Sequence, residues 1–166
     1  MKMAYSTSLS TTSRDSKRAE REKFKEKQYW DERYETEEHF DWFCQLSSFE
    51  HLLFQHVKPS DRILNLGCGN SSLSASLYEK GYQNIDNIDF SQTVISSMKE
   101  RTQYMMPKMR WHVMDMLELA FDSGSFDVEL DKGSLDALMV DQGDVWNPKQ
   151  EVIRRVEKAI AEVSFH

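Results

Sequence analysis

The residues best suited to chemistry form a glycine-containing turn and an acidic position that follows it. Gly67 and Gly69 stand one residue apart in the stretch LNLGCGNSSLS, directly after a short apolar run. Glycines remove side chains where a backbone turn must approach a ligand closely. Asp89 follows Gly67 by 22 residues (89 − 67), close to the spacing of about 20 at which an acidic residue accepts hydrogen bonds from ribose hydroxyls. These residues predict a site for a ligand that contains a nucleoside.

The nucleoside ligand is either NAD or S-adenosylmethionine. The dinucleotide fingerprint has glycine at the sixth position of the turn, where this chain has Ser72. The turn holds no basic residue, and no arginine sits beside Asp89 to receive a 2′-phosphate. S-adenosylmethionine carries no pyrophosphate, so we favour it. A second acidic residue, Asp115, is placed to accept from an adenine amino group; the alternative is that Asp115 caps a helix that begins at MLEL.

Alternating strands and helices must position these residues. We expect strands at 62–66, 84–89, 109–115 and 125–131, and helices at 47–57, 71–81, 91–105 and 134–140, with a last one at 148–163. Ser91 is expected as an N-cap, and Pro148 in the first turn of the last helix. This alternation predicts an α/β fold with an open, mostly parallel sheet and helices on both faces. Ligands of such sheets bind at the carboxyl ends of the strands.

Four motifs resemble those of the class I S-adenosylmethionine-dependent methyltransferases, which have a Rossmann-like fold: LNLGCGNSSLS, NIDFS, WHVMDM and FDVELDKGSLDAL. YWDERY, FDWF and DKGSLDAL further resemble the methyltransferase-like branch that modifies lysine in proteins, and most of all the enzyme that methylates translation elongation factor 1-alpha. The resemblance runs from about Gln28 to the end of the sequence. It implies a protein-lysine methyltransferase that uses S-adenosylmethionine and acts on a protein substrate such as elongation factor 1-alpha.

The resemblance also implies cofactor contacts at matching positions. Aromatic residues that close over the cofactor, the glycine turn, the ribose and adenine sites and a lysine beside the cofactor correspond to Trp30, Tyr34, Trp42, Gly67, Asp89, Phe90, Asp115, Met116 and Lys132. Aromatic faces attract cations, which suits a sulfonium. The alternative for the three lid aromatics is a hydrophobic cap over the core, and for Lys132 a surface lysine.

The acceptor side of the reaction is less defined by the sequence. An acceptor lysine must be neutral to react, and a dry pocket lowers its pKa from about 10.4. Asp131 and Asp136 flank the expected active face, and either could bind the lysine. No residue is assigned as a catalytic base. The five histidines show no metal-ligand spacing, so no metal is expected.

Domain organisation is read from composition and from the resemblance. Residues 1–27 are expected to be disordered or a charged helical segment, and 28–166 an incomplete methyltransferase domain. Class I methyltransferases typically have seven strands, so the C-terminal strands are expected to be missing and the chain to be truncated. The alternative function is therefore an inactive methyltransferase-like protein that binds a partner through an exposed sheet edge. Glu129 is also unusual, because a strand covered on both faces should be apolar.

Composition bounds the partners and the location. The chain has 166 residues, 39% of them hydrophobic, and a formal net charge of -7, which argues against nucleic acid and anionic membranes as partners. No apolar run approaches the roughly 18 residues that span a bilayer. Cys44 and Cys68 show no pairing pattern, which favours a reducing compartment. A cytoplasmic location is expected, with the mitochondrion as the alternative because the N-terminus is rich in Ser, Thr and Arg.

Overall fold

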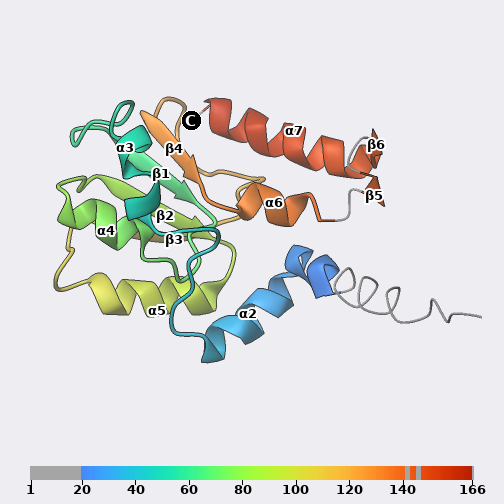
Figure 1. Cartoon of the computed structure of the whole chain (residues 1–166), viewed down its shortest axis with the longest axis horizontal. Helices are drawn as coiled ribbons and strands as arrows, with labels where there is room; N and C mark the ends of the chain where they lie inside the picture. The colour runs from blue at the N-terminus through green and yellow to red at the C-terminus, as the bar shows by residue number, and fades with distance from the viewer. Residues whose placement is uncertain (1–19, 141–142, 145–146, 166) are drawn as a thin grey trace, which may run out of the picture.

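A parallel four-stranded sheet forms the centre of the protein (Figure 1). The computed structural model describes residues 20–140, 143–144 and 147–165. The sheet has the order β3-β2-β1-β4, with strands β1 (Ile63–Leu66), β2 (Ile85–Asp89), β3 (Arg110–Val113) and β4 (Val128–Asp131). A separate two-stranded antiparallel pair consists of β5 (Gly143–Asp144) and β6 (Asn147–Pro148). All four predicted strands are confirmed, each slightly shorter than expected.

Helices precede, separate and follow the strands. Before β1 lie η1 (Lys23–Lys25), α2 (Lys27–Thr36), η2 (Leu46–Ser48) and α3 (Glu50–Leu53). After β1 come α4 (Leu73–Glu79), α5 (Gln92–Thr102), α6 (Ser134–Leu138) and α7 (Gln150–Phe165). No helix in the described ranges is long and apolar enough to cross a membrane.

Both faces of the sheet are covered, as predicted. On one face Ile63 and Ile85 pack with Leu77 of α4. On the other face Leu64 packs with Ala159 of α7 and with residues of α6. Figure 1 shows α4 and α5 on one side of the strands and α6 and α7 on the opposite side. The α/β arrangement with helices on both faces is therefore confirmed.

Buried polar side chains explain why two central strands read as ILNL and IDNID. The Asn65 amide donates to Ser74 Oγ at 2.9 Å and to Asn87 Oδ1 at 3.2 Å, and the Asn87 amide donates to the Arg110 carbonyl at 3.1 Å. Because these groups bond one another, the buried strands tolerate them. The Glu129 carboxylate is accommodated differently: β4 is only half-buried, so Glu129 does not lie in a fully covered strand.

Of three local predictions, one is confirmed and two are wrong. Ser91 caps α5, as predicted, by accepting from the Val94 amide. The prediction for Pro148 is wrong, because Pro148 lies in β6 and α7 begins at Gln150. The single helix expected at 47–57 is also wrong: η2 and α3 are short, separate turns whose apolar residues pack on the core.

The N-terminal segments reach the carboxyl ends of the strands. Phe24, within the segment predicted as charged or disordered, packs its ring 5.6 Å from that of Trp30 and 5.4 Å from that of Trp42. Residues 1–19 of that segment lie outside the described residues. The domain boundary at 27/28 stays a prediction, but Phe24 shares the aromatic cluster of the following segment.

Candidate functional site

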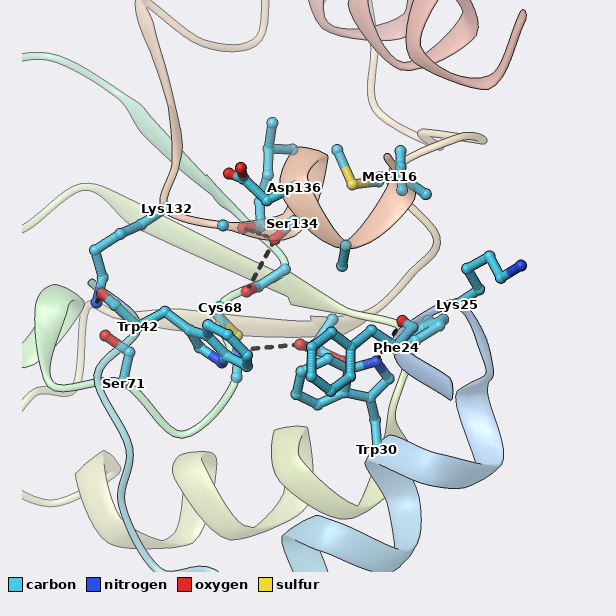
Figure 2. A pocket seen from close by; sticks show the side chains of 18 of the residues that line it. Phe24, Lys25, Trp30, Trp42, Cys68, Ser71, Met116, Lys132, Ser134 and Asp136 are labelled. Atoms are coloured by element: carbon cyan, nitrogen blue, oxygen red, sulfur yellow. Dashed lines mark hydrogen bonds between the residues drawn. The ribbon is translucent and has the colours of Figure 1, made fainter. Parts of the chain in front are cut away.

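A cavity of about 950 Å³ opens at the carboxyl ends of the four parallel strands. Its wall is made by the turn after β1, the residues that end or follow β2, β3 and β4, and aromatic side chains of α2 and the loop after it. Every residue predicted as a cofactor contact lines it: Trp30, Tyr34, Trp42, Gly67, Asp89, Phe90, Asp115, Met116 and Lys132. In Figure 2 the rings of Phe24, Trp30 and Trp42 gather on one side of the cavity, and Ser134, Asp136 and Met116 lie opposite.

The glycine turn after β1 has a second purpose besides the expected approach to a ligand. Gly67 and Gly69 have φ of 52° and 50°, in the left-handed region that favours glycine. A Cβ on Gly67 would overlap Ser134 Oγ, and a Cβ on Gly69 would lie 2.9 Å from Tyr34 Oη. Ser134 Oγ donates to the Leu66 carbonyl at 3.1 Å, which joins the start of α6 to the turn. The two glycines therefore make room for side chains of this chain itself.

Asp89 is a buried carboxylate at the end of β2. Its side chain accepts from the Gly69 amide at 3.0 Å through Oδ2 and from the Ser91 amide at 2.9 Å through Oδ1. Burial raises the pKa of Asp89 to about 6, although these two hydrogen bonds lower it. Each carboxylate oxygen has two lone pairs, so further donors in the cavity can still be accepted. Asp89 thus fixes the glycine turn and presents an acceptor to the cavity.

Asp115 and Met116 follow β3 and have separate roles. Asp115 is exposed, and its Oδ1 accepts from the Leu117 amide at 2.8 Å. Asp115 therefore caps the residues that follow it, as in the alternative prediction, but these residues form a turn and not a helix. Met116 is buried against Leu64 and Leu66 while also lining the cavity.

The aromatic side chains of α2 and the following loop form one packed cluster. The Trp30 indole, 7% exposed, donates to the Phe24 carbonyl at 2.8 Å. Its ring stacks on Tyr34 with centroids 5.7 Å apart and meets Trp42 edge-on at 6.0 Å. Burial raises the pKa of the Tyr34 hydroxyl, which keeps it protonated as a donor. These aromatics pack as one cluster and also line the cavity, and their closing over the cofactor stays a prediction.

Arg33 is a functional candidate that the sequence reading missed. Its guanidinium lies over three rings, 5.5 Å from the centroid of Trp30, 4.8 Å from Phe40 and 5.6 Å from Trp42. Two parallel hydrogen bonds of 2.9 and 2.8 Å join it to the Glu37 carboxylate, and this pairing raises the pKa of Arg33. The chain therefore supplies its own cation to the aromatic cluster. An Arg–Glu pair at positions i and i+4 beside an aromatic run was the available signal.

Lys132, the residue directly after β4, holds the loop at 41–44. Its ammonium, on a side chain 13% exposed, donates to the Asp41 carboxylate at 2.9 Å and to the carbonyls of Trp42 at 3.1 Å and Cys44 at 3.3 Å. It is therefore not the free surface lysine of the alternative reading.

Asp41 was not predicted, yet it is the most connected side chain of the loop. Besides Lys132, it accepts from the hydroxyls of Ser71 and Ser72 at the start of α4. Burial works to raise the pKa of Asp41, but the hydrogen bonds from these hydroxyls and from Lys132 outweigh it and lower the pKa to about 2. Asp41 is thus an ionised residue that fastens the aromatic loop to the glycine turn.

Candidate metal ligands do not cluster in the part of the chain that the structure describes. Within residues 20–140, 143–144 and 147–165, no group of three or more His, Cys, Asp or Glu side chains is arranged to hold a metal ion. The site is thus built from a glycine turn, two acidic strand ends and an aromatic lid.

A family model described as a methyltransferase domain matches residues 63–158, more than half of the chain. The chain belongs to the methyltransferase domain family. The matched range contains the glycine turn and both acidic strand ends. The predicted class I methyltransferase assignment and its Rossmann-like sheet are confirmed.

Named relatives of this methyltransferase domain chain are lysine methyltransferases. EEF1A lysine methyltransferase 4 of Mus musculus is 42% identical over 144 residues, which cover 85% of this chain and 56% of the relative. The eEF1A lysine and N-terminal methyltransferase of Mus musculus is 39% identical over 137 residues, 81% of this chain and 19% of that protein. The chain thus spans about half the length of the first of these relatives.

A solved structure shows a partial likeness to this chain. Geranyl diphosphate C-methyltransferase from Streptomyces coelicolor A3(2) matches 51% of this chain and 34% of its own with a TM-score of 0.43 and 19% identity. A likeness of this size does not bear on substrate or mechanism.

Proposed function

We propose that the chain carries the cofactor site of an S-adenosylmethionine-dependent methyltransferase that modifies a lysine side chain of a protein, with translation elongation factor 1-alpha as the acceptor. The observation that carries the proposal is one cavity in which the glycine turn, Asp89 and Asp115 meet at adjacent strand ends, in a methyltransferase domain chain. The acceptor is supported by relatives whose names state that they are eEF1A lysine methyltransferases.

The residues of the cavity fit S-adenosylmethionine. The buried Asp89 carboxylate can accept from ribose hydroxyls while it keeps its bonds to Gly69 and Ser91. Asp115 is exposed to the cavity and can accept from the adenine amino group. When bound, S-adenosylmethionine supplies an electrophilic methyl group on a sulfonium. Trp30 and Trp42 present aromatic surface to that cation, beside the faces that Arg33 occupies.

The chain's own residues then position the reactants and exclude water. The cluster of Phe24, Trp30, Tyr34 and Trp42 covers one side of the cavity with apolar surface. An apolar wall disfavours the charged form of an amine, so it lowers the pKa of an incoming lysine.

Calorimetric titration of the 166-residue chain with S-adenosylmethionine, with NAD in parallel, tests the cofactor. We expect micromolar binding of S-adenosylmethionine that is lost in Asp89→Ala. Binding of NAD alone would contradict the proposal. Transfer of a labelled methyl group to purified elongation factor 1-alpha tests the acceptor, and a folded, cofactor-binding chain without transfer would favour the inactive binding partner.

We also propose a cytoplasmic location. Cys44 and Cys68 are both free thiols, which fits a reducing compartment. A fluorescent fusion at the C-terminus, imaged beside a mitochondrial marker, separates the cytoplasm from the mitochondrion.

A further inference from the structure

Phe43 is the one residue other than glycine with a positive φ in the described part of the chain, at 63°. Cys44 donates its amide to the Trp42 carbonyl at 2.8 Å, so Phe43 is the central residue of a tight three-residue turn. Such a turn is strained when its central residue has positive φ, and a bulky aromatic residue is poorly suited to it. Strain of this kind persists where neighbouring contacts enforce it, and it concentrates at functional sites.

The contact that enforces the turn comes from Lys132. Its ammonium donates to the carbonyls on both sides of Phe43, those of Trp42 and Cys44. The Phe43 side chain is 70% exposed. An exposed aromatic ring held on a strained backbone gains little from burial, so the fold alone does not explain it.

Phe43 stands between two cavities. A second cavity of about 330 Å³ lies between the loop at Phe43 and Cys44, the end of β4 and the start of α6, with Phe49 and Leu73 also in its wall. Phe43, Lys132, Gly133 and Asp136 line both this cavity and the larger one. The ring of Phe43 lies so close to Gly133 that a Cβ there would be 3.2 Å from it. Phe43 and Gly133 thus form the boundary between the two cavities.

The strand order gives the larger cavity a direction. Along the sheet β3-β2-β1-β4, Asp115, Asp89, Gly67 and Lys132 follow one another at the carboxyl ends. If adenine and ribose lie at β3 and β2, the methionine part of the cofactor extends towards β1 and β4. The second cavity adjoins that end, at β4.

The two acidic residues beside the second cavity differ in their engagement. Asp131 accepts from the amides of Gly133, Ser134 and Leu135, and so it caps the start of α6. Asp136 is exposed, and its carboxylate makes no hydrogen bond or ion pair to another described residue. Figure 2 shows Asp136 on the side of the cavity opposite the aromatic cluster. Asp136 is therefore the carboxylate that can receive an incoming cation.

We infer that the second cavity admits the acceptor lysine side chain, with Phe43 as the apolar wall for its methylene groups and the exposed Asp136 as the carboxylate that attracts its ammonium on entry. The apolar wall then favours the neutral amine that reacts. This inference rests on the proposed function and names the residues of its acceptor site. The occupant is an unbranched alkylammonium side chain on an accessible segment of a protein. Phe43 contacts this side chain directly, whereas Lys132 is a positioning residue that holds the strained turn.

Phe43→Gly and Asp136→Asn test the inference in the full chain. Phe43→Gly removes the ring and also the backbone strain, because glycine adopts positive φ freely. We expect it to leave the Tm unchanged or higher, while the affinity for elongation factor 1-alpha falls about tenfold more than that for S-adenosylmethionine. If Phe43 had only a structural role, Phe43→Gly would instead lower the Tm of the chain. Asp136→Asn should also weaken the acceptor about tenfold, and Asp122→Asn, a remote exposed carboxylate, should not.

A second readout does not depend on the identity of the protein acceptor. Nα-acetyl-lysine amide is titrated into the ¹⁵N-labelled chain saturated with S-adenosylhomocysteine, with the uncharged norleucine amide as control. We expect the amide signals of Gly133 and Asp136 to shift with the lysine probe alone, and to stop shifting in Phe43→Gly. If these signals do not shift in the wild-type chain, or if they shift equally in Phe43→Gly, the inference is overturned, while the cofactor site is unaffected. A chain that binds no S-adenosylmethionine overturns the proposed function and this inference together.

Discussion

The ammonium group of Lys132 lies 2.9 Å from the carboxylate of Asp41, which joins the end of β4 to the loop that carries Trp42 across the cavity. The side chains of both residues are largely buried, at 13% and 8% exposed. Asp41 also binds the hydroxyls of Ser71 and Ser72. Through this ion pair and these two hydrogen bonds, Asp41 connects three segments: the loop, the glycine turn and the residues after β4.

Lys132→Met is expected to loosen this loop. Methionine keeps most of the length of the side chain but removes the ammonium that pairs with the Asp41 carboxylate, which costs about 1–3 kcal/mol of unfolding free energy. Calorimetry should show S-adenosylmethionine affinity reduced by about tenfold or more, and limited proteolysis should cut faster near residues 41–44.

The control for that variant is Lys99→Met, an exposed lysine on α5 that should leave both readouts unchanged. Adding Asp41→Asn to Lys132→Met should cost less than the sum of the two single changes, because the partners act as a pair. Additive costs would show that Lys132 and Asp41 act independently.

Cofactor binding is expected to weaken as the pH falls through 6. Ribose hydroxyls donate to the ionised form of Asp89, whose pKa burial raises to about 6. At pH 5 about one-tenth of this carboxylate is ionised, so the affinity measured by calorimetry should be about tenfold lower than at pH 8. In Asp89→Asn the affinity should be low and independent of pH. A wild-type profile that stays flat from pH 8 to 5 would contradict this role.

The same group gives a pH dependence of stability in the free chain. Because the pKa of Asp89 in the folded protein, about 6, lies above its ordinary 3.8, the folded state holds the proton more tightly. The contribution of Asp89 to the free energy of unfolding is thus highest below pH 4 and falls by about 3 kcal/mol as the pH rises to 6. Asp41, whose pKa is lowered to about 2, acts oppositely and loses its contribution only below pH 4. Urea denaturation at pH 4.5 and 6.5, compared between wild type and Asp89→Asn, should show the fall in wild type alone.

The elements of the fold and the acidic strand ends were predictable because their signals are local. A short apolar run, a turn and an acidic residue after the next strand are all visible within about 25 residues, and this is how Gly67, Asp89 and Asp115 were found. The aromatic lid was found through the resemblance of YWDERY and FDWF to a known family. The packing of this lid against Phe24 was not predicted, because Phe24 is a single aromatic residue within a run of charged residues.

The contacts that fasten the site were not predictable, because they join distant positions. Lys132 and Asp41 are 91 residues apart, and Ser134 bonds the carbonyl of Leu66 across 68 residues. No periodicity links such pairs. The prediction for Pro148 was wrong for another reason. Proline is tolerated both in a first helical turn and at the edge of a sheet, and here Pro148 lies in the β5–β6 pair. The positive φ of Phe43 likewise has no signal in its residue type.

Arg33→Lys is expected to disturb the aromatic cluster despite the conserved charge. Lysine lacks the planar guanidinium that stacks on three rings and pairs twice with Glu37. We expect a loss of about 1–2 kcal/mol in unfolding free energy, together with a change in tryptophan fluorescence. Arg62→Lys is the matched control, because Arg62 makes the same two-point pair with Asp127 at an exposed site and should change stability little. Equal effects of the two variants would show that stacking on the rings adds nothing.

Gly67→Ala is expected to destabilise the free chain before any ligand is present. Its Cβ would overlap Ser134 Oγ, and the residue has φ of 52°. Gly124→Ala is the matched control, since Gly124 has φ of 73° with nothing within 4 Å of its Cβ, so it measures backbone strain alone at about 1–2 kcal/mol. The overlap should add about 1–3 kcal/mol in Gly67→Ala, and a second change, Ser134→Gly, should recover part of that excess in chemical denaturation. If Gly67 instead served only the approach of the cofactor, Gly67→Ala would match Gly124→Ala in stability and lose cofactor affinity alone.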